Sequence, residues 1–266
     1  DDNELAAISY KIKPLNFSGK IIYTPYLNFN VRNADANYDE YFWDEVRKKV
    51  NLEDAVILAK TKKTNFKVAV AMKYSLAKND RNIDVSSVVV EDKLYVANSF
   101  QVSVEKNCEY TLNKYVSVIT NLNYQNSLLE KALSKVNQAK SIKFSTLLFN
   151  HSKAWGSIWE KADIQIEDDL KSQQAIRYNI FQMYQTYTGN NPTLNIGPKG
   201  FTGEKYGGAT YWDTEAFCLP FFLKTSQKKV ARQLLIYRYN HLSKAIENAK
   251  KLGFDNGAAL YPMVTM

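Results

Sequence analysis

The chain has 266 residues, 45% of them apolar and 23% charged, a balance typical of a folded globular protein and not of a disordered one. Its net charge of +8 comes from lysines scattered among acidic residues, with no arginine-rich arm and no zinc-type Cys/His spacing, so we expect no nucleic-acid partner and no metal site. Two distant cysteines, Cys108 and Cys218, are too few for a disulfide scaffold, and no stretch approaches the roughly 20 apolar residues of a membrane helix; we therefore expect a cytoplasmic protein with no membrane partner.

The first part of the chain, from residue 20 to about 120, has a strand-like pattern. Short runs rich in β-branched and aromatic residues lie at 21–23, 56–58, 66–70, 94–96 and 114–120. Clusters of Asn, Asp and Lys separate these runs, as turns require. Strands at this spacing, with no helices between them, predict antiparallel sheets packed as a sandwich. We interpret residues 39–50 as a helical insertion.

After Asn123 the apolar residues recur with a helical period. Three stripes show this period: Phe144, Leu147, Leu148, His151, Trp155, Ile158 and Trp159; Ile176, Ile180, Met183, Tyr184 and Tyr187; and Val230, Leu234, Leu235, Leu242, Ala245, Ile246, Ala249 and Leu252. Asp168 and Asp169 are placed to cap the second helix, and Gly253 to end the third stripe. The chain is thus all-β first and all-α second, and the helices at about 124–161 read as a connecting pair.

Residues 195–208 form a long segment that holds five of the ten glycines. Glycines allow positive φ angles and close backbone approach, which suits a loop folded over a ligand. The alternative is a tightly packed turn between helices. A nucleotide phosphate loop is not expected, because no strand precedes the segment and the Gly-Lys-Ser/Thr ending is absent.

The next run, 209–223, is almost wholly apolar apart from Asp213 and Glu215. A carboxylate buried among apolar residues is costly unless it is paired, and the hydroxyls of a sugar can pair it. Trp212 beside Asp213 offers a ring for the C–H face of a pyranose and an acceptor for its hydroxyls. Alternatively, either carboxylate caps a helix or pairs with a lysine or arginine. We expect structural roles for both histidines, His151 and His241.

The run 197–208, followed by Tyr211-Trp212-Asp213-Thr214-Glu215, resembles the signature of the maltose, kojibiose and trehalose phosphorylases, glycoside hydrolase family 65. Flanking segments agree with the resemblance, which covers nearly the whole chain: 12–19, His151 to Ile164, 173–181, 234–239 and 257–263. Within the family, residues 210–213 and 261–263 look most like the maltose-specific branch.

The resemblance implies a multi-domain β + α protein. Residues 1–123 would be part of an antiparallel β-sandwich, 124–162 a helical linker, and 163–266 the first helices of an (α/α)6 catalytic barrel. The implied reaction is inverting phosphorolysis of an α-glucosidic disaccharide: maltose and phosphate would give β-glucose 1-phosphate and glucose. Inorganic phosphate is the co-substrate, and no metal or organic cofactor is expected. Trp212 and Asp213 would hold the non-reducing glucose, and Tyr206 and Glu215 are hypothesised to line the same pocket.

The chain departs from the family in one respect. The family's general acid and phosphate-binding residues lie in later barrel elements, and the sequence stops at Met266 before reaching them. We therefore expect no catalytic residue here, an inactive fragment, and a need for the remainder of the barrel in a longer, homodimeric protein. Two other readings stay open: an inverting α-glucoside hydrolase on the same fold, and a non-catalytic carbohydrate-binding protein.

Overall fold

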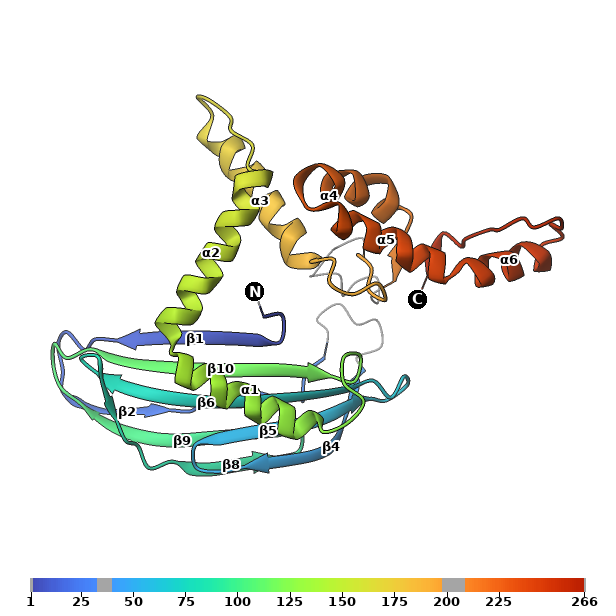
Figure 1. The fold of residues 1–266 in the computed structure, drawn as a ribbon. Helices are drawn as coiled ribbons and strands as arrows, with labels where there is room; N and C mark the ends of the chain where they lie inside the picture. The colour runs from blue at the N-terminus through green and yellow to red at the C-terminus, as the bar shows by residue number, and fades with distance from the viewer. Residues whose placement is uncertain (1, 33–39, 198–208, 266) are drawn as a thin grey trace. The chain divides into compact units, whose positions relative to one another are not determined.

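A computed structural model describes residues 2–32, 40–197 and 209–265. The chain forms two compact units, one with the described residues up to Lys153 and one that begins at Ala154. The first unit contains two antiparallel sheets and a helix, and the second is mainly helical (Figure 1). The predicted combination of antiparallel sheets followed by helices is confirmed.

The larger sheet has the strand order β1–β10–β6–β5–β4, with β7 also paired to β6. Its strands are β1 (Leu5–Ile12), β4 (Trp43–Val50), β5 (Asp54–Thr61), β6 (Lys67–Lys78), β7 (Arg81–Ile83) and β10 (Tyr110–Thr120). The smaller sheet has the order β2–β9–β3, with β8 also paired to β9. Its strands are β2 (Gly19–Tyr23), β3 (Tyr26–Asn28), β8 (Val88–Asp92) and β9 (Tyr95–Val104). Every strand pair in both sheets is antiparallel.

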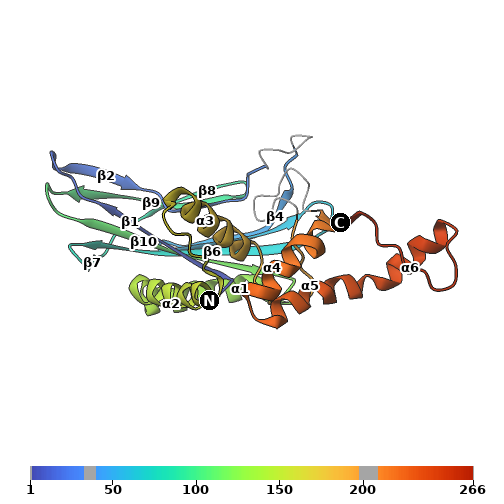
Figure 2. The same cartoon turned by 90° about the horizontal axis from the view of Figure 1, so that it is seen from above.

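The core of the first unit has two layers. Between the sheets, side chains of β5 and β6 such as Ile57 and Met72 pack against Val96 of β9. On the opposite face of the larger sheet lies helix α1 (Leu128–Ile142), whose Val136 packs near Val56 (Figures 1 and 2). Because both faces of β5 are covered, its sequence reads as a continuous apolar run instead of an alternation.

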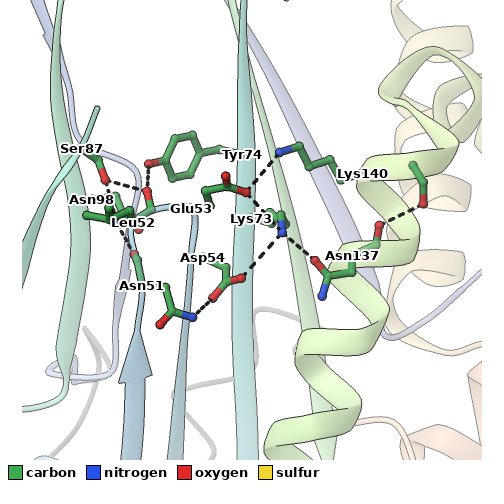
Figure 3. Close-up of polar contacts among 11 residues, drawn as sticks. Asn51, Leu52, Glu53, Asp54, Lys73, Tyr74, Ser87, Asn98, Asn137 and Lys140 are labelled. Atoms are coloured by element: carbon green, nitrogen blue, oxygen red, sulfur yellow. Dashed lines mark hydrogen bonds and ion pairs between the residues drawn. The ribbon is translucent and has the colours of Figure 1, made fainter. Parts of the chain in front are cut away.

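The turn between β4 and β5 is fixed by side-chain hydrogen bonds from β6 of the larger sheet, from Ser87 just before β8, and from β9 of the smaller sheet (Figure 3). The Tyr74 hydroxyl and Ser87 Oγ both donate to the carbonyl of Leu52, at 2.8 and 2.6 Å. Asn98, wholly buried in β9, donates from Nδ2 to the carbonyl of Asn51 at 2.7 Å. These bonds satisfy turn carbonyls that the strand ladder leaves unpaired, and they hold the turn in one place.

The same turn is also fixed to helix α1 (Figure 3). Lys73 donates from Nζ to Asn137 Oδ1 of α1 at 2.8 Å, and its Nζ lies 3.7 Å from Asp54 Oδ2. Both side chains of that ion pair are only 16% exposed, so water screens the pair less than it would at the open surface. The turn therefore joins the sandwich to the helix that covers it.

The helix expected over residues 39–50 is wrong: residues 43–50 form strand β4, paired with β5. Trp43 and Val50 both pack on the core between the sheets, although they are seven residues apart. In a regular strand such residues point to opposite faces. A bulge between Glu45 and Arg47 adds one residue and turns both side chains to the same face.

The second unit contains the predicted helices that follow α1. Its elements are α2 (Phe144–Ala162, which begins in the first unit), α3 (Leu170–Thr186), β11 (Thr210–Tyr211), the π-helical turn η3 (Thr214–Cys218), α4 (Leu219–Thr225), α5 (Lys228–Asn240), α6 (Leu242–Lys251) and β12 (Val264–Thr265). The third stripe is two helices, because the backbone breaks at His241. Asp169 caps α3 by accepting from the amides of Lys171 and Ser172. Gly253 follows α6 at φ +84°, as predicted for a helix end.

Candidate functional site

Trp212 lies between strand β11 and the π-helical turn η3. Its indole Nε1 donates to the carbonyl of Pro262 at 3.1 Å, and the residue is 51% exposed. Pairing of β11 with β12 places Tyr211 opposite Val264 and so brings the segment around Pro262 to the tryptophan. The indole is thus held by its N–H edge while half of the residue surface remains open to solvent.

Asp213 follows Trp212 and precedes η3. The residue is exposed, and its side chain makes no capping hydrogen bond to the turn. The expected burial of this carboxylate among apolar side chains does not occur. An exposed carboxylate next to Trp212 in the chain can accept hydrogen bonds from a ligand.

Glu215, in the first turn of η3, is joined to Arg238 of α5 by a two-pronged ion pair. Arg238 Nε donates to Oε1 at 2.7 Å and Nη2 donates to Oε2 at 2.9 Å. Nη2 also donates to the carbonyl of Tyr211 at 3.0 Å, and Arg238 is 9% exposed. Pairing with an arginine was one of the alternatives open for this carboxylate, and a bidentate pair is the arrangement that best satisfies a buried guanidinium.

The chain just before the undescribed residues 198–208 contacts the chain just after them. Thr214 is buried and donates from Oγ1 to the carbonyl of Ile196 at 2.7 Å. A side chain at Gly197 would place its Cβ 3.3 Å from the carbonyl of Ala209, so the backbones approach closely there. Tyr206, predicted to line the same pocket, lies outside the described residues.

Two other side chains of the second unit that could be reactive, Cys218 and His241, have surroundings that favour structural roles. Burial raises the pKa of the Cys218 thiol, and the charges of Asp213 and Glu215 raise it further, so the thiolate is disfavoured. His241 places Nδ1 2.7 Å from the carbonyl of Tyr237, which fits the structural role expected for it. His151 lies in the part of α2 that belongs to the first unit, and it is exposed.

Three further observations concern a surface depression, metal ligands and membrane-spanning helices. An open depression of about 910 Å³ runs along α3, and none of the predicted site residues lines it. Within the described ranges, no three His, Cys, Asp or Glu side chains gather as ligands of a metal ion would. No helix in the described part of the chain is both long and apolar enough to cross a membrane.

The sequence pattern missed Arg238, which contacts residues on both sides of the Trp212–Asp213 pair. A signal was present. Arg238 follows Val230, Ala231 and Leu234 at spacings of eight, seven and four residues, on the buried face of α5. An arginine on an apolar helix face requires a partner, although the sequence does not say which one.

Comparison with known proteins identifies both halves of the chain. Residues 1–158 match the N-terminal domain of glycosyl hydrolase family 65, and residues 177–266 match its central catalytic domain. Maltose phosphorylase of Bacillus subtilis (strain 168) is 40% identical and alpha,alpha-trehalose phosphorylase of Thermoanaerobacter brockii is 36% identical; each alignment covers 98% of this chain and 34% of the relative. A solved structure described as a putative kojibiose phosphorylase from the human microbiome superimposes with a TM-score of 0.84 at 29% identity, over 98% of this chain and 33% of that one. The chain thus spans about one third of the length of these relatives. With more than half of its residues matched by the N-terminal domain alone, this chain belongs to glycoside hydrolase family 65.

Proposed function

We propose that the protein carrying this chain, at the length of its relatives, performs inverting phosphorolysis of an α-glucosidic disaccharide. The proposed substrates are maltose and phosphate, and the products β-glucose 1-phosphate and glucose. The observation that carries the proposal is the pairing of a half-exposed, edge-anchored Trp212 with the exposed carboxylate of Asp213. Relatives named maltose, trehalose and kojibiose phosphorylases support the reaction class.

The two side chains supply complementary contacts to a glucose ring. The indole covers the apolar C–H face of the sugar, and the carboxylate accepts hydrogen bonds from its hydroxyls. Asp213 serves as an acceptor here and not as the general acid. Tyr206 and Glu215 belong to the same proposed pocket, with Glu215 already engaged by Arg238.

The reaction needs one carboxylic acid to protonate the leaving oxygen. An inverting hydrolase also needs a base to activate water, but phosphate is already an anionic nucleophile. We propose that the general acid and the phosphate-binding residues lie in barrel elements outside these 266 residues. No metal or organic cofactor takes part in this scheme.

The proposal includes a division of the chain into a β-sandwich at 1–123, a helical linker at 124–162 and the start of an (α/α)6 barrel at 163–266. The limits of the secondary structure support these boundaries. Strand β10 ends at Thr120, the two helices that follow lie between Leu128 and Ala162, and α3 begins at Leu170.

The test is release of glucose 1-phosphate from maltose, with and without phosphate, by the protein at its natural length. Asp213→Asn and Trp212→Phe should each lower kcat/KM by about 10- to 100-fold, because each removes a contact that holds the reacting sugar. Glu247→Gln, on the exposed surface of α6, is the control and should leave kcat/KM unchanged. Glucose release that does not need phosphate would contradict the proposal in favour of a hydrolase. Sugar binding without turnover would contradict it in favour of a binding protein.

A further inference from the structure

We infer that Arg238 and Glu215 form a clamp that positions Trp212 and Asp213 for the sugar. The inference rests on the proposed function of the Trp212–Asp213 pair and assigns Arg238 a role in it. Arg238 is a positioning residue in this scheme, because it acts on the sugar only through its neighbours.

A single guanidinium spans the segment that carries the pair. Arg238 binds the carbonyl of Tyr211, which precedes Trp212, and the carboxylate of Glu215, which follows Asp213. Its side chain is 11% exposed, so the charge is held away from water and depends on these partners. The chain between the two contact points is therefore fixed at both ends from one rigid group.

The backbone of Arg238 extends the clamp to the C-terminal segment. The Tyr261 hydroxyl donates to the carbonyl of Arg238 at 3.0 Å, and the neighbouring carbonyl of Pro262 accepts from the Trp212 indole. The contacts form a closed circuit. Tyr261 joins α5 to the neighbouring Pro262, Pro262 holds the Trp212 indole, and Tyr211, which precedes Trp212, is bound to Arg238 of α5. Such a circuit fixes the direction of the indole face before the sugar arrives, which lowers the cost of binding.

The chain offers a matched control with the same chemistry in another place. Arg177 donates from Nε and Nη2 to the two carboxylate oxygens of Asp163, at 2.7 and 2.6 Å. Its side chain is 47% exposed, compared with 11% for Arg238. This pair joins α3 to the residue just after α2, and neither partner lies next to Trp212 in the sequence.

The experiment compares Arg238→Lys and Glu215→Gln with Arg177→Lys in the protein at its natural length, labelled with 5-fluorotryptophan. Lysine keeps the charge but cannot form the two-pronged bond. The Trp212 fluorine resonance is assigned from its loss in Trp212→Phe. We expect both clamp variants to shift or broaden this resonance, to raise the KM for maltose and to lower kcat/KM by about 100-fold, while the KM for phosphate stays within about two-fold. Arg177→Lys should leave the resonance and both KM values unchanged.

Separate measurement of kcat and of the KM for maltose distinguishes a positioning effect from a simple loss of folded protein. Partial unfolding lowers the active fraction and hence kcat, but it leaves the KM for maltose unchanged. An unchanged maltose KM and Trp212 resonance in both clamp variants would overturn the inference, as would an equal effect of Arg177→Lys. If wild-type protein shows no phosphate-dependent cleavage, the proposed function fails. The Trp212 resonance then still tests the clamp, because it needs no sugar.

Discussion

The hydrogen bonds at the β4–β5 turn make a quantitative prediction about the first unit. The Leu52 carbonyl accepts from both Tyr74 and Ser87, so removal of one donor leaves it with the other. Tyr74→Phe and Ser87→Ala should therefore each cost only about 1 kcal/mol, the net value of one hydrogen bond. Ser87 Oγ also accepts from Asn98 Nδ2 at 3.4 Å, but that amide keeps its shorter bond to the Asn51 carbonyl when Ser87 is replaced. The double variant leaves this carbonyl without either donor and should cost a further ~1–3 kcal/mol beyond the sum of the singles. The two donors are 5% and 8% exposed, so water has little access to replace them.

The measurement is amide hydrogen exchange in peptides from β6 and β9, whose slowest amides report the free energy of opening of this unit. Tyr184→Phe is the control, because it removes a hydroxyl donor to the Thr225 carbonyl in the second unit. Combined with Ser87→Ala, it should give additive effects. If the costs of Tyr74→Phe and Ser87→Ala add up to that of the double variant within about 0.5 kcal/mol, the shared carbonyl does not couple the two donors and the reasoning is refuted.

Two further predictions concern acid stability and backbone conformation. Burial acts to raise the pKa of Glu4, but hydrogen bonds from Lys135 and two other side chains outweigh it and lower the pKa. The first unit should therefore lose stability as the pH falls below about 4.3, the ordinary value for a glutamate, and Glu4→Gln should flatten that decline in urea-unfolding midpoints measured across the acid range. In the second unit, Gly189 has φ +69° and an added Cβ would lie 2.7 Å from the Cα of Val230. Gly189→Ala should cost at least about 2 kcal/mol, whereas Gly156→Ala, in a helix with open space around it, should stabilise by about 0.5–1 kcal/mol; equal unfolding midpoints would contradict this.

The architecture was predictable where each element carries its own periodicity. The apolar runs of β5 and β6 and the helical stripes of α2 and α3 specify strand or helix without knowledge of their partners. Strand β4 was not predictable in this way, since a bulge replaces the period of two with an irregular spacing. The break at His241 was hidden as well, because the stripe of apolar residues continues from α5 into α6.

The candidate site was predictable only in part. Trp212 and Asp213 stand out because an aromatic and a carboxylate interrupt an apolar run after a glycine-rich segment. Their support was not visible, since Arg238 is 23 residues from Glu215 and 27 from Tyr211 in the sequence. Contacts over such separations depend on how the helices pack, and no local pattern encodes that.

The place of β10 in the larger sheet has a consequence for folding during synthesis. Strand β1 pairs with β10, and the residues joined are far apart, from Ile12 with Tyr110 to Leu5 with Ser117. At about 5–20 residues per second, a ribosome needs roughly 5–20 s to make the ~100 residues that separate the two strands. During that time β1 lacks its partner β10. The arrival of β10 then pairs β1 on one side and β6 on the other, so a single late strand closes the sheet. Topology of this kind favours slow folding, and β1 depends on protection from aggregation until β10 is complete.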